Sequence, residues 1–507
     1  MKRFKFFSLV LALLLAAGTQ DAQADKSDDT LRIAWGSNGV MHNADNYYGN
    51  TRAGIWFTKS VWDTLIERNP ITSEYVGNLA TGWTWIDDTT LEFKLRQGVK
   101  FHNGEPFDAD DVVYTYNKVS TDEGVKTKRL VNWIDKTEKI DQWTVRIHTK
   151  GAFPQAIEYL TGPLPIYPNE YYEKVGAEGM SNMPIGTGPY KAVKMKPGEE
   201  YTLVRNEDYN WGSPKSKAKI KHVIIREIPD LQTQVAELIA GGIDMTPDLT
   251  TDLVEKLQGV PGVAAEQAET LRIFYIGFDA AGRTGVKPIT DVRVRRAISH
   301  AINRKSIVDN LMRGAAKVIN TPCHPKQFGC VDSAAVSYDY DIEKAKKLLA
   351  EAGYPNGFEL ELYAEAPAHE AEAVIGDLAA IGIQAKLNRL PWEVYADALA
   401  NDKTPVFLTN WGSASLADAS AIISRFFNGN ADDYARDPEV TEWLKVADTN
   451  TDPEKRKEFY AKAIKRITEQ AYFLSLYTGV RSYGYDSNLD FIPYVDEVLR
   501  FHEYSWK

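Results

Sequence analysis

The sequence lacks the features that mark several common protein classes. Its formal charge is −11 at pH 7, so it has no basic excess of the kind that binds nucleic acid or an anionic membrane surface. After residue 24, no stretch reaches roughly eighteen uninterrupted apolar residues, the length that a membrane-spanning helix needs. We therefore expect no nucleic-acid partner and no transmembrane helix in the mature chain.

Motifs for catalysis are also lacking. "HEAEA" (369–373) begins like a zinc-protease motif, but Ala373 stands where the second histidine is needed. In "GTGPYK" (186–191), Lys191 occupies the third glycine position of a dinucleotide loop, which favours a plain turn. No G-x-S-x-G or G-x-x-x-x-G-K-[ST] motif occurs, and the eight histidines are scattered. We predict no catalytic residue, no metal site and no cofactor. A secreted hydrolase with carboxylates that face each other across a cleft stays open as a distant alternative.

The N-terminus carries the one long apolar run. Lys2, Arg3 and Lys5 precede the run of residues 6–18, and "AQA" (22–24) supplies the small residues that signal peptidase prefers. No cysteine lies near this point, which argues against a lipid anchor on the mature N-terminus. Residues 1–24 are thus predicted to be a signal peptide, and the mature protein is expected to be exported.

Cysteine is rare, and both copies lie in one short segment, "PCHPKQFGC". Cys323 and Cys330 are seven residues apart in a loop that contains Pro and Gly. In an oxidising compartment this spacing favours a local disulfide. A metal site that includes His324 is the alternative, but no fourth ligand is near.

Strand-like and helix-like segments alternate along the chain, which predicts an α/β protein. "LEFKL" (91–95) and "WTVRIHT" (143–149) alternate apolar and polar residues as strands do. Asp108 is placed to cap a helix that follows it, and residues 341–353 carry an apolar stripe that ends at Gly353. No repeat or low-complexity linker is found, so we expect interwoven domains.

Tryptophans at expected strand ends and loops are the main candidates for ligand binding. Each one by itself is more often explained by packing in a core or a domain interface, but five together favour a binding cleft, because aromatic faces stack on rings and attract cations. They are Trp35, Trp56, Trp133, Trp392 and Trp411.

Small residues follow Trp411 in "LTNWGSASLADASAI" (408–422). Small side chains build little core, and glycine weakens a strand. We interpret this segment, with Gly412 and Ser413, as a wall that leaves space for a ligand.

Four segments resemble the solute-binding proteins of ABC importers, of the peptide/nickel/opine type known as family 5. They occur in the family's order, at 95–116, 184–191, 291–308 and 341–362. The resemblance implies a two-lobed periplasmic binding protein fold of type II with an additional inserted domain. It also implies a ligand cleft between the lobes, hinge closure, delivery to a membrane permease in the periplasm, and no chemistry on the ligand.

Domain limits follow from the same resemblance. Lobe 1 is expected in three pieces, the inserted domain between the first two, and lobe 2 before the last. The predicted limits are 1–24 for the signal peptide, 25–70, 186–285 and 480–507 for lobe 1, 71–185 for the inserted domain and 286–479 for lobe 2.

The resemblance also bears on individual residues of the cleft. Dipeptide-binding relatives carry Trp-x-x-Asp in the loop that begins here at Trp411, and the carboxylate grips the α-amino group of the ligand. Ala414 stands at that place, and the nearest acid is Asp418. Either Asp418 takes over this role, or the ligand has no amine there. An equal alternative is that Asp418 caps the helix that follows.

Three further residues are predicted from their places in the family pattern. Trp133, with Arg129 nearby, lies where nickel-binding relatives have a cleft tryptophan, although the histidine that they use is absent. Trp56 and Arg52 are expected to contact ligand from lobe 1, with Arg52 available for a carboxylate or phosphate. A solvated loop is the alternative for Arg52.

The predicted function is that of a monomeric receptor for a short peptide. An opine, a sugar conjugate or a sugar phosphate is the alternative ligand, which the missing loop aspartate keeps open.

Overall fold

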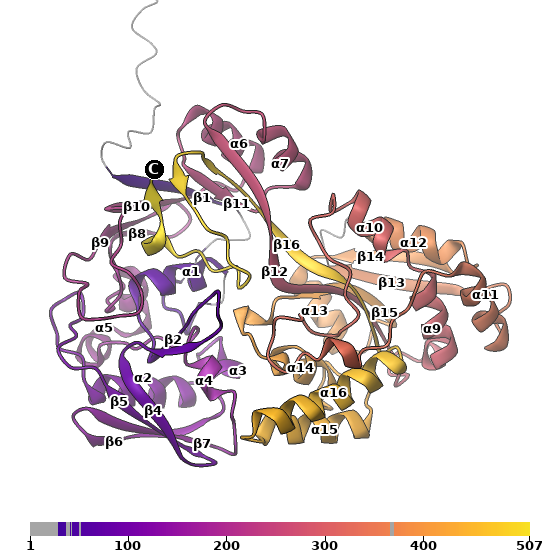
Figure 1. The fold of residues 1–507 in the computed structure, drawn as a ribbon, viewed down its shortest axis with the longest axis horizontal. Helices are drawn as coiled ribbons and strands as arrows, with labels where there is room; N and C mark the ends of the chain where they lie inside the picture. The colour runs from indigo at the N-terminus through magenta and orange to yellow at the C-terminus, as the bar shows by residue number, and fades with distance from the viewer. Residues whose placement is uncertain (1–28, 37–40, 42, 50–51, 366–369) are drawn as a thin grey trace, which may run out of the picture.

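The computed structural model describes residues 29–36, 41, 43–49, 52–365 and 370–507, so the predicted signal peptide lies outside the described residues. The chain forms two lobes joined by a pair of long antiparallel strands, β12 and β16, which run from one lobe into the other (Figure 1). Both strands belong to one sheet of ten strands that extends through both lobes. The predicted α/β, two-lobed fold is therefore confirmed.

The order of strands in this sheet shows how discontinuous pieces of sequence build each lobe. The lobe 1 part of the sheet consists, in order from its edge, of β8 (Tyr190–Lys196), β9 (Glu200–Arg205), β10 (His222–Glu227), β1 (Thr30–Trp35) and β11 (Met245–Pro247). The sheet continues through β16 (Phe473–Asp486) and β12 (Val263–Phe278) into lobe 2, with β15 (Val406–Trp411), β13 (Glu359–Glu365) and β14 (Gln384–Leu390).

The inserted domain is a separate sheet of four strands covered by helices. The strand order is β4 (Ala80–Asp87), β5 (Thr90–Leu95), β7 (Thr144–Thr149) and β6 (Ile134–Asp141), and a two-stranded ribbon of β2 (Ile66–Arg68) and β3 (Tyr75–Gly77) leads into it. Its helices are α2 (Ala109–Thr121), α3 (Lys128–Val131), α4 (Ala156–Tyr159) and α5 (Asn169–Asn182).

The helix predicted after Asp108 is α2, and it begins with a reciprocal capping box. The Asp108 carboxylate accepts from the Asp110 N–H at 2.8 Å, while the Asp111 carboxylate accepts from the Asp108 N–H at 2.9 Å. Two of the otherwise unpaired N–H groups of the first turn are thereby satisfied.

Lobe 1 and the inserted domain share one apolar core. The helix α1 (Arg52–Val61) of lobe 1 supplies Phe57, and Trp62 follows directly; the Trp62 ring lies 5.5 Å from that of Tyr167 in the inserted domain. The remaining lobe 1 helices are α6 (Leu231–Ala240) and α7 (Thr251–Leu257). Because dense side-chain packing resists shear, we treat lobe 1 and the inserted domain as one body.

Lobe 2 has its own two apolar cores, on opposite sides of its part of the sheet. Its helices are α8 (Lys287–Thr290), α9 (Val292–Ala301), α10 (Arg304–Asn310), α11 (Ile342–Glu351), α12 (Ala371–Ala379), α13 (Trp392–Ala400), α14 (Ile423–Phe427), α15 (Pro438–Thr449) and α16 (Pro453–Glu469).

The passage from lobe 1 to lobe 2 lies inside β12. Its pairing with β16 is irregular between Glu269 and Ile273. Beyond that point, Ile276 and Phe278 are buried in a core of lobe 2. Side chains of β12 thus already pack in a lobe 2 core before residue 285, because a long strand can serve two cores in succession, and the limit at 285/286 stays a prediction.

The predicted disulfide joins Cys323 to Cys330, with the two Cα atoms 5.9 Å apart. His324 is buried, and its Nε2 lies 3.4 Å from a Glu269 carboxylate oxygen. Among the described residues, no group of three or more His, Cys, Asp or Glu is placed to hold a metal ion.

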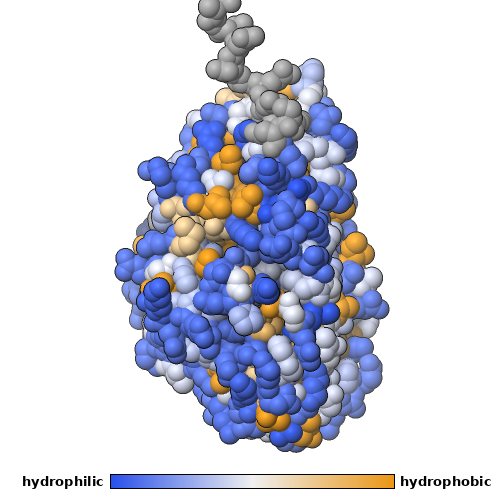
Figure 2. All heavy atoms as spheres, turned by 90° about the vertical axis from the view of Figure 1, so that its left-hand side faces the viewer, coloured by the Kyte–Doolittle hydropathy of each residue, from blue (hydrophilic) through white to orange (hydrophobic). Residues whose placement is uncertain are grey.

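The outer face of lobe 1 and the inserted domain is mostly hydrophilic, with a group of hydrophobic residues in its upper part (Figure 2). Within the described part of the chain, no helix has both the length and the apolar character that a membrane crossing requires.

Candidate functional site

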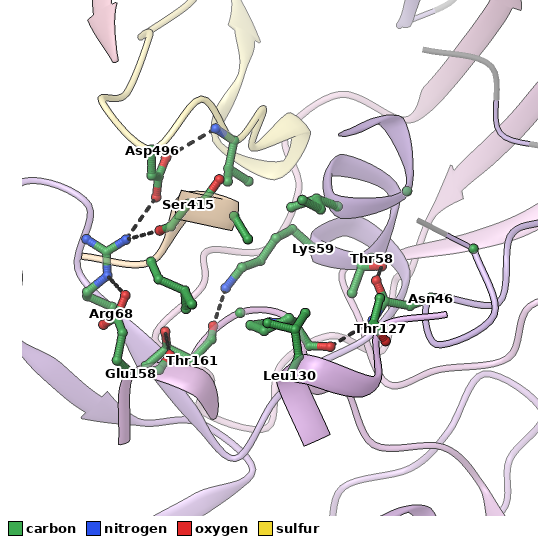
Figure 3. Close-up of a pocket in the computed structure, with 18 of the residues that line it drawn as sticks. Asn46, Thr58, Lys59, Arg68, Thr127, Leu130, Glu158, Thr161, Ser415 and Asp496 are labelled. Atoms are coloured by element: carbon green, nitrogen blue, oxygen red, sulfur yellow. Dashed lines mark hydrogen bonds and ion pairs between the residues drawn. The ribbon is translucent and has the colours of Figure 1, made fainter. Parts of the chain in front are cut away.

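A cavity of about 70 Å³ lies at the seam between the two lobes (Figure 3). Its lining comes from three parts of the chain. Lobe 1 contributes residues from 43 to 68 and from 496 to 500, the inserted domain contributes residues from 127 to 163, and lobe 2 contributes Ala414, Ser415 and Leu416. A cavity that needs both lobes for its walls is complete only when the lobes are closed.

One end of the cavity is lined by ion pairs of lobe 1. The Lys59 ammonium, carried by α1, contacts the Glu67 carboxylate and donates to the Thr161 carbonyl, both at 2.6 Å. Arg500 donates to Asp496 at 2.7 Å. Burial lowers the pKa of Lys59 even though Glu67 opposes this, whereas for Asp496 the Arg500 guanidinium outweighs burial and holds the pKa below its ordinary value. These charges are therefore neutralised by one another.

A further ion pair lies at the seam between the lobes. Arg68 of β2 lies 3.3 Å from the Glu158 carboxylate and donates to the Ser415 carbonyl of lobe 2 at 3.2 Å. The same carboxylate accepts from the Ala417 N–H at 2.7 Å. Burial raises the pKa of Glu158, against the lowering effect of Arg68. Glu158 thus joins lobe 1, the inserted domain and lobe 2 at one point.

Arg129 differs from the other three cations that line the cavity. Its side chain is exposed, and no carboxylate among the described residues pairs with it. Its guanidinium carbon lies 5.8 Å from the centre of the Trp411 ring, and that of Arg425, which pairs with Asp432 at 2.7 Å, lies 5.5 Å from it. A free guanidinium at a cavity wall is suited to bind a carboxylate or phosphate.

The lobe 2 wall of the cavity has an unusual backbone. Ser413, Ala414 and Ser415 all have positive φ values, of 54°, 51° and 64°. A left-handed conformation costs a residue with a side chain roughly 1–2 kcal/mol, so three in succession need support from their surroundings. The Ser413 hydroxyl is buried and has no hydrogen-bond partner among the described residues. We call residues 413–419 the wall segment.

The small residues predicted to leave space for a ligand lie at this wall. Ala414, at the position of the missing aspartate, and Ser415 line the cavity directly. Ser413 is buried just behind them, and at Gly412 a Cβ atom would meet the Arg272 guanidinium at 2.7 Å. Trp411 stands beside the cavity, because its ring contacts Arg129, which lines it, and its Nε1–H donates to the Ala421 carbonyl at 2.9 Å.

Asp418 acts as a helix cap, the second of the two alternatives. Its carboxylate accepts from the Ser420 N–H at 3.0 Å, at the start of the short 3₁₀ helix η5 (Ala419–Ala421), and from the Arg456 guanidinium at 2.8 Å. Asp418 is buried and does not line the cavity. Its charge is already compensated, so it has no free oxygen pointed at a ligand amine.

Two predicted tryptophans belong to apolar cores instead of the cavity lining. Trp56 is buried, meets Trp35 edge-on at 5.5 Å and donates to the Glu497 carbonyl at 2.7 Å. Trp133 is buried and stacks on Phe153 at 5.1 Å. Ile55, next to Trp56, and Leu130, three residues before Trp133, line the cavity instead.

The last two predicted residues lie elsewhere. Trp392 begins α13, is 47% exposed and is not part of the cavity lining. Arg52 is the first residue of α1, and its side chain lies outside the described residues.

Sequence reasoning missed most of the charged lining: Lys59, Glu67, Arg68, Glu158, Asp496 and Arg500. A signal was present in the first part of this set, since Lys59 interrupts "GIWFTKSVW" and Glu67-Arg68 follows the apolar run "TLI". Charges inside apolar runs are costly to bury and so mark paired or functional groups.

Two lobes around a shared cavity, linked by crossing strands, define the class of the solute-binding receptors. The comparisons agree: residues 74–434 match the profile of the bacterial extracellular solute-binding proteins, family 5. This chain belongs to that family, whose members bind a small ligand or peptide and deliver it to an ABC importer.

Individual relatives differ in what their names say they bind. Heme-binding protein A of Haemophilus influenzae is 28% identical over 90% of this chain and 90% of its own length. The dipeptide-binding protein of Escherichia coli is 26% identical over 81% of this chain and 82% of its own length. The solved structure of HbpA2 from Haemophilus parasuis superposes with a TM-score of 0.80 at 25% identity, covering 94% of this chain and all of that one.

Proposed function

We propose that this protein is a periplasmic receptor that encloses a short peptide between its lobes and delivers it to an ABC permease. The observation that carries the proposal is the cavity whose lining comes from both lobes and the inserted domain. Likeness to the dipeptide-binding protein supports a peptide as the ligand. The proposal includes export after loss of residues 1–24, action as a monomer and no chemistry on the ligand.

Entry of a ligand requires the lobes to separate. The cavity of about 70 Å³ has room for a few water molecules, each of which needs about 10–15 Å³ by this measure, and a dipeptide needs more space. Among the strands that the structure describes, only β12 and β16 cross between the lobes, and the irregular pairing between Glu269 and Ile273 is a natural place for bending. Ligand contacts with both lobes then shift the equilibrium toward the closed state.

The chemistry of the cavity favours a ligand with a carboxylate. We assign the ligand carboxylate to Arg129, because the other lining cations, Lys59, Arg68 and Arg500, already have acidic partners. A charge-assisted hydrogen bond is among the stronger polar contacts.

A second candidate ligand is an acidic solute without an amine, such as an opine or a sugar phosphate. The lining contains four cations against the three acids Glu67, Glu158 and Asp496, so its net charge is positive. With Asp418 paired to Arg456, no wall-segment carboxylate is available for an amine.

Native mass spectrometry of the purified protein would reveal a ligand retained during isolation. Calorimetry should follow, with a panel of di- and tripeptides, opines, sugar conjugates, sugar phosphates and hemin. We expect micromolar or tighter binding of peptides, near −8 kcal/mol. Binding of sugar phosphates or opines alone would favour the second candidate, release of product from a peptide or glycoside would indicate a hydrolase, and no binding at all would contradict the receptor function.

A further inference from the structure

The disulfide loop packs directly against the back of the wall segment, although the two are about ninety residues apart in sequence. The Phe328 N–H donates to the Ala417 carbonyl at 2.8 Å, and the Ala419 N–H donates to the Phe328 carbonyl at 2.9 Å. Phe328 and Asp418 therefore form a short parallel β-bridge between the disulfide loop, residues 323–330, and the wall segment.

Side chains of this loop add to the backbone contacts. Gln327 is buried, and its Nε2 donates to the carbonyls of Leu416 at 2.9 Å and Asp418 at 3.3 Å. The Arg456 guanidinium, which pairs with Asp418, lies 4.7 Å from the centre of the Phe328 ring. Loop and wall segment are thus held by the same polar groups of lobe 2.

The disulfide keeps this loop in the shape that these contacts need. Gly329 has a φ of +80°, and a Cβ at this position would meet the Tyr460 ring at 2.4 Å, so the turn is tight and closely packed. Cys323 and Cys330 close the turn on either side of Gln327 and Phe328. Without the cross-link, a loop of this kind gains many alternative conformations.

The other face of the wall segment meets the opposite lobe. Ala417 donates to Glu158, and Ser415 accepts from Arg68. The three successive left-handed residues at 413–415 precede these contacts. A strained backbone keeps its conformation only when its surroundings hold it, and the disulfide loop is the support that lobe 2 itself provides.

We propose that the disulfide loop is a brace that holds the wall segment in its ligand-binding conformation, so that Cys323, Cys330 and Gln327 are positioning residues for ligand binding. This inference rests on the proposed function of the cavity. It assigns the disulfide a role beyond global stability: in its absence lobe 2 stays folded around the core that α9, α11 and α12 form, to which neither cysteine belongs, while the wall segment opens locally.

Amide hydrogen exchange in the absence of any ligand tests the brace. In the double variant Cys323→Ser/Cys330→Ser, we expect exchange at the Ala419 amide to be at least tenfold faster, with exchange in α9, which packs in the other core of lobe 2, unchanged. Val374→Ala, a truncation of a buried residue in α12, is the matched control: it lowers Tm but should change exchange at Ala419 less than threefold. Exchange at Ala419 within twofold of the wild type, with both thiols absent, would overturn the proposal.

Gln327→Ala is the second variant, and it decides the question if the double variant does not fold. It keeps the disulfide and removes the bonds to Leu416 and Asp418, so faster exchange at Ala419 is expected again, and unchanged exchange would contradict the brace. Titration with L-alanyl-L-alanine adds a binding readout, with an expected affinity loss of about tenfold for both variants. If the wild-type protein binds nothing in the panel, the proposed function fails, whereas the exchange data still decide the brace.

Discussion

The two sides of the cavity differ in how they are built. Lobe 1 and the inserted domain, which share one core, contribute all the charged groups of the lining. Lobe 2 contributes only Ala414, Ser415 and Leu416, on a strained segment that is supported from behind. The buried charges of lobe 2 near the cavity, Asp418 and Arg456, lie behind this wall.

The two sides of the cavity therefore have different roles, since one recognises the ligand and the other encloses it. The charged side offers groups that select a ligand, and the lobe 2 side offers backbone and small side chains that cover it. Substitutions on the first side should therefore change affinity directly, and substitutions behind the wall should change stability and affect affinity only through the conformation of the wall segment. The predictions below test this division, from the largest expected effect to the smallest.

Asp418→Asn should give the largest loss of stability. The substitution leaves the Arg456 guanidinium buried without its carboxylate partner, which costs about 3–5 kcal/mol of unfolding free energy. Urea unfolding measures the loss, with the exposed Asp490→Asn as control. A loss of unfolding free energy below about 1 kcal/mol would mean that the ion pair does not stabilise this part of lobe 2.

Glu370→Gln should stabilise the protein at high pH. Glu370 is buried at the start of α12, and burial raises its pKa to about 7. Its contribution to stability is complete below its unfolded pKa, about 4.5, and is lost as pH rises through 7.

Glutamine carries no charge at any pH, so this variant should exceed the wild type by roughly 3 kcal/mol at pH 8 and match it near pH 4. Calorimetric unfolding at both pH values checks this, with Glu372→Gln, exposed on the same helix, as control. An equal effect at both pH values would show that Glu370 does not titrate between them.

Arg129→Gln should give the largest loss of affinity. It removes the lining cation that has no acidic partner among the described residues, at a cost of about 2 kcal/mol or about 30-fold in Kd. Calorimetry with the ligand found in the panel measures this loss. Lys126→Gln, an exposed charge three residues away, is the control and should leave Kd unchanged. Equal affinities for the two variants would remove Arg129 from the site.

Ala414→Gly should give the smallest change, a gain in stability. Glycine adopts a positive φ without the steric cost of a Cβ, and its greater freedom in the unfolded chain cancels part of this benefit. The expected net gain is about 0.5 kcal/mol. Ala236→Gly, exposed in the middle of α6, should instead lose about 1 kcal/mol. Similar losses for both variants would show that the wall segment is not strained.

Local patterns account for what was predicted correctly. The capping box at Asp108, the strands at 91–95 and 143–149 and the disulfide each depend on residues close together in sequence. The family pattern extended these to the two-lobed fold. The tryptophans were a weaker guide, because the same aromatic residue serves a core or a cleft, and only packing distinguishes Trp56 from Trp411.

The amino-acid sequence by itself determined the class of fold, the family and the small residues of the wall segment, since periodicity, turns and motifs are read along the chain. Tertiary structure alone decided which charges line the cavity, that Asp418 pairs with Arg456, and that the disulfide loop packs behind the wall segment. The reason is physical: the cavity walls come from segments hundreds of residues apart in sequence, and burial determines which partner each charge finds.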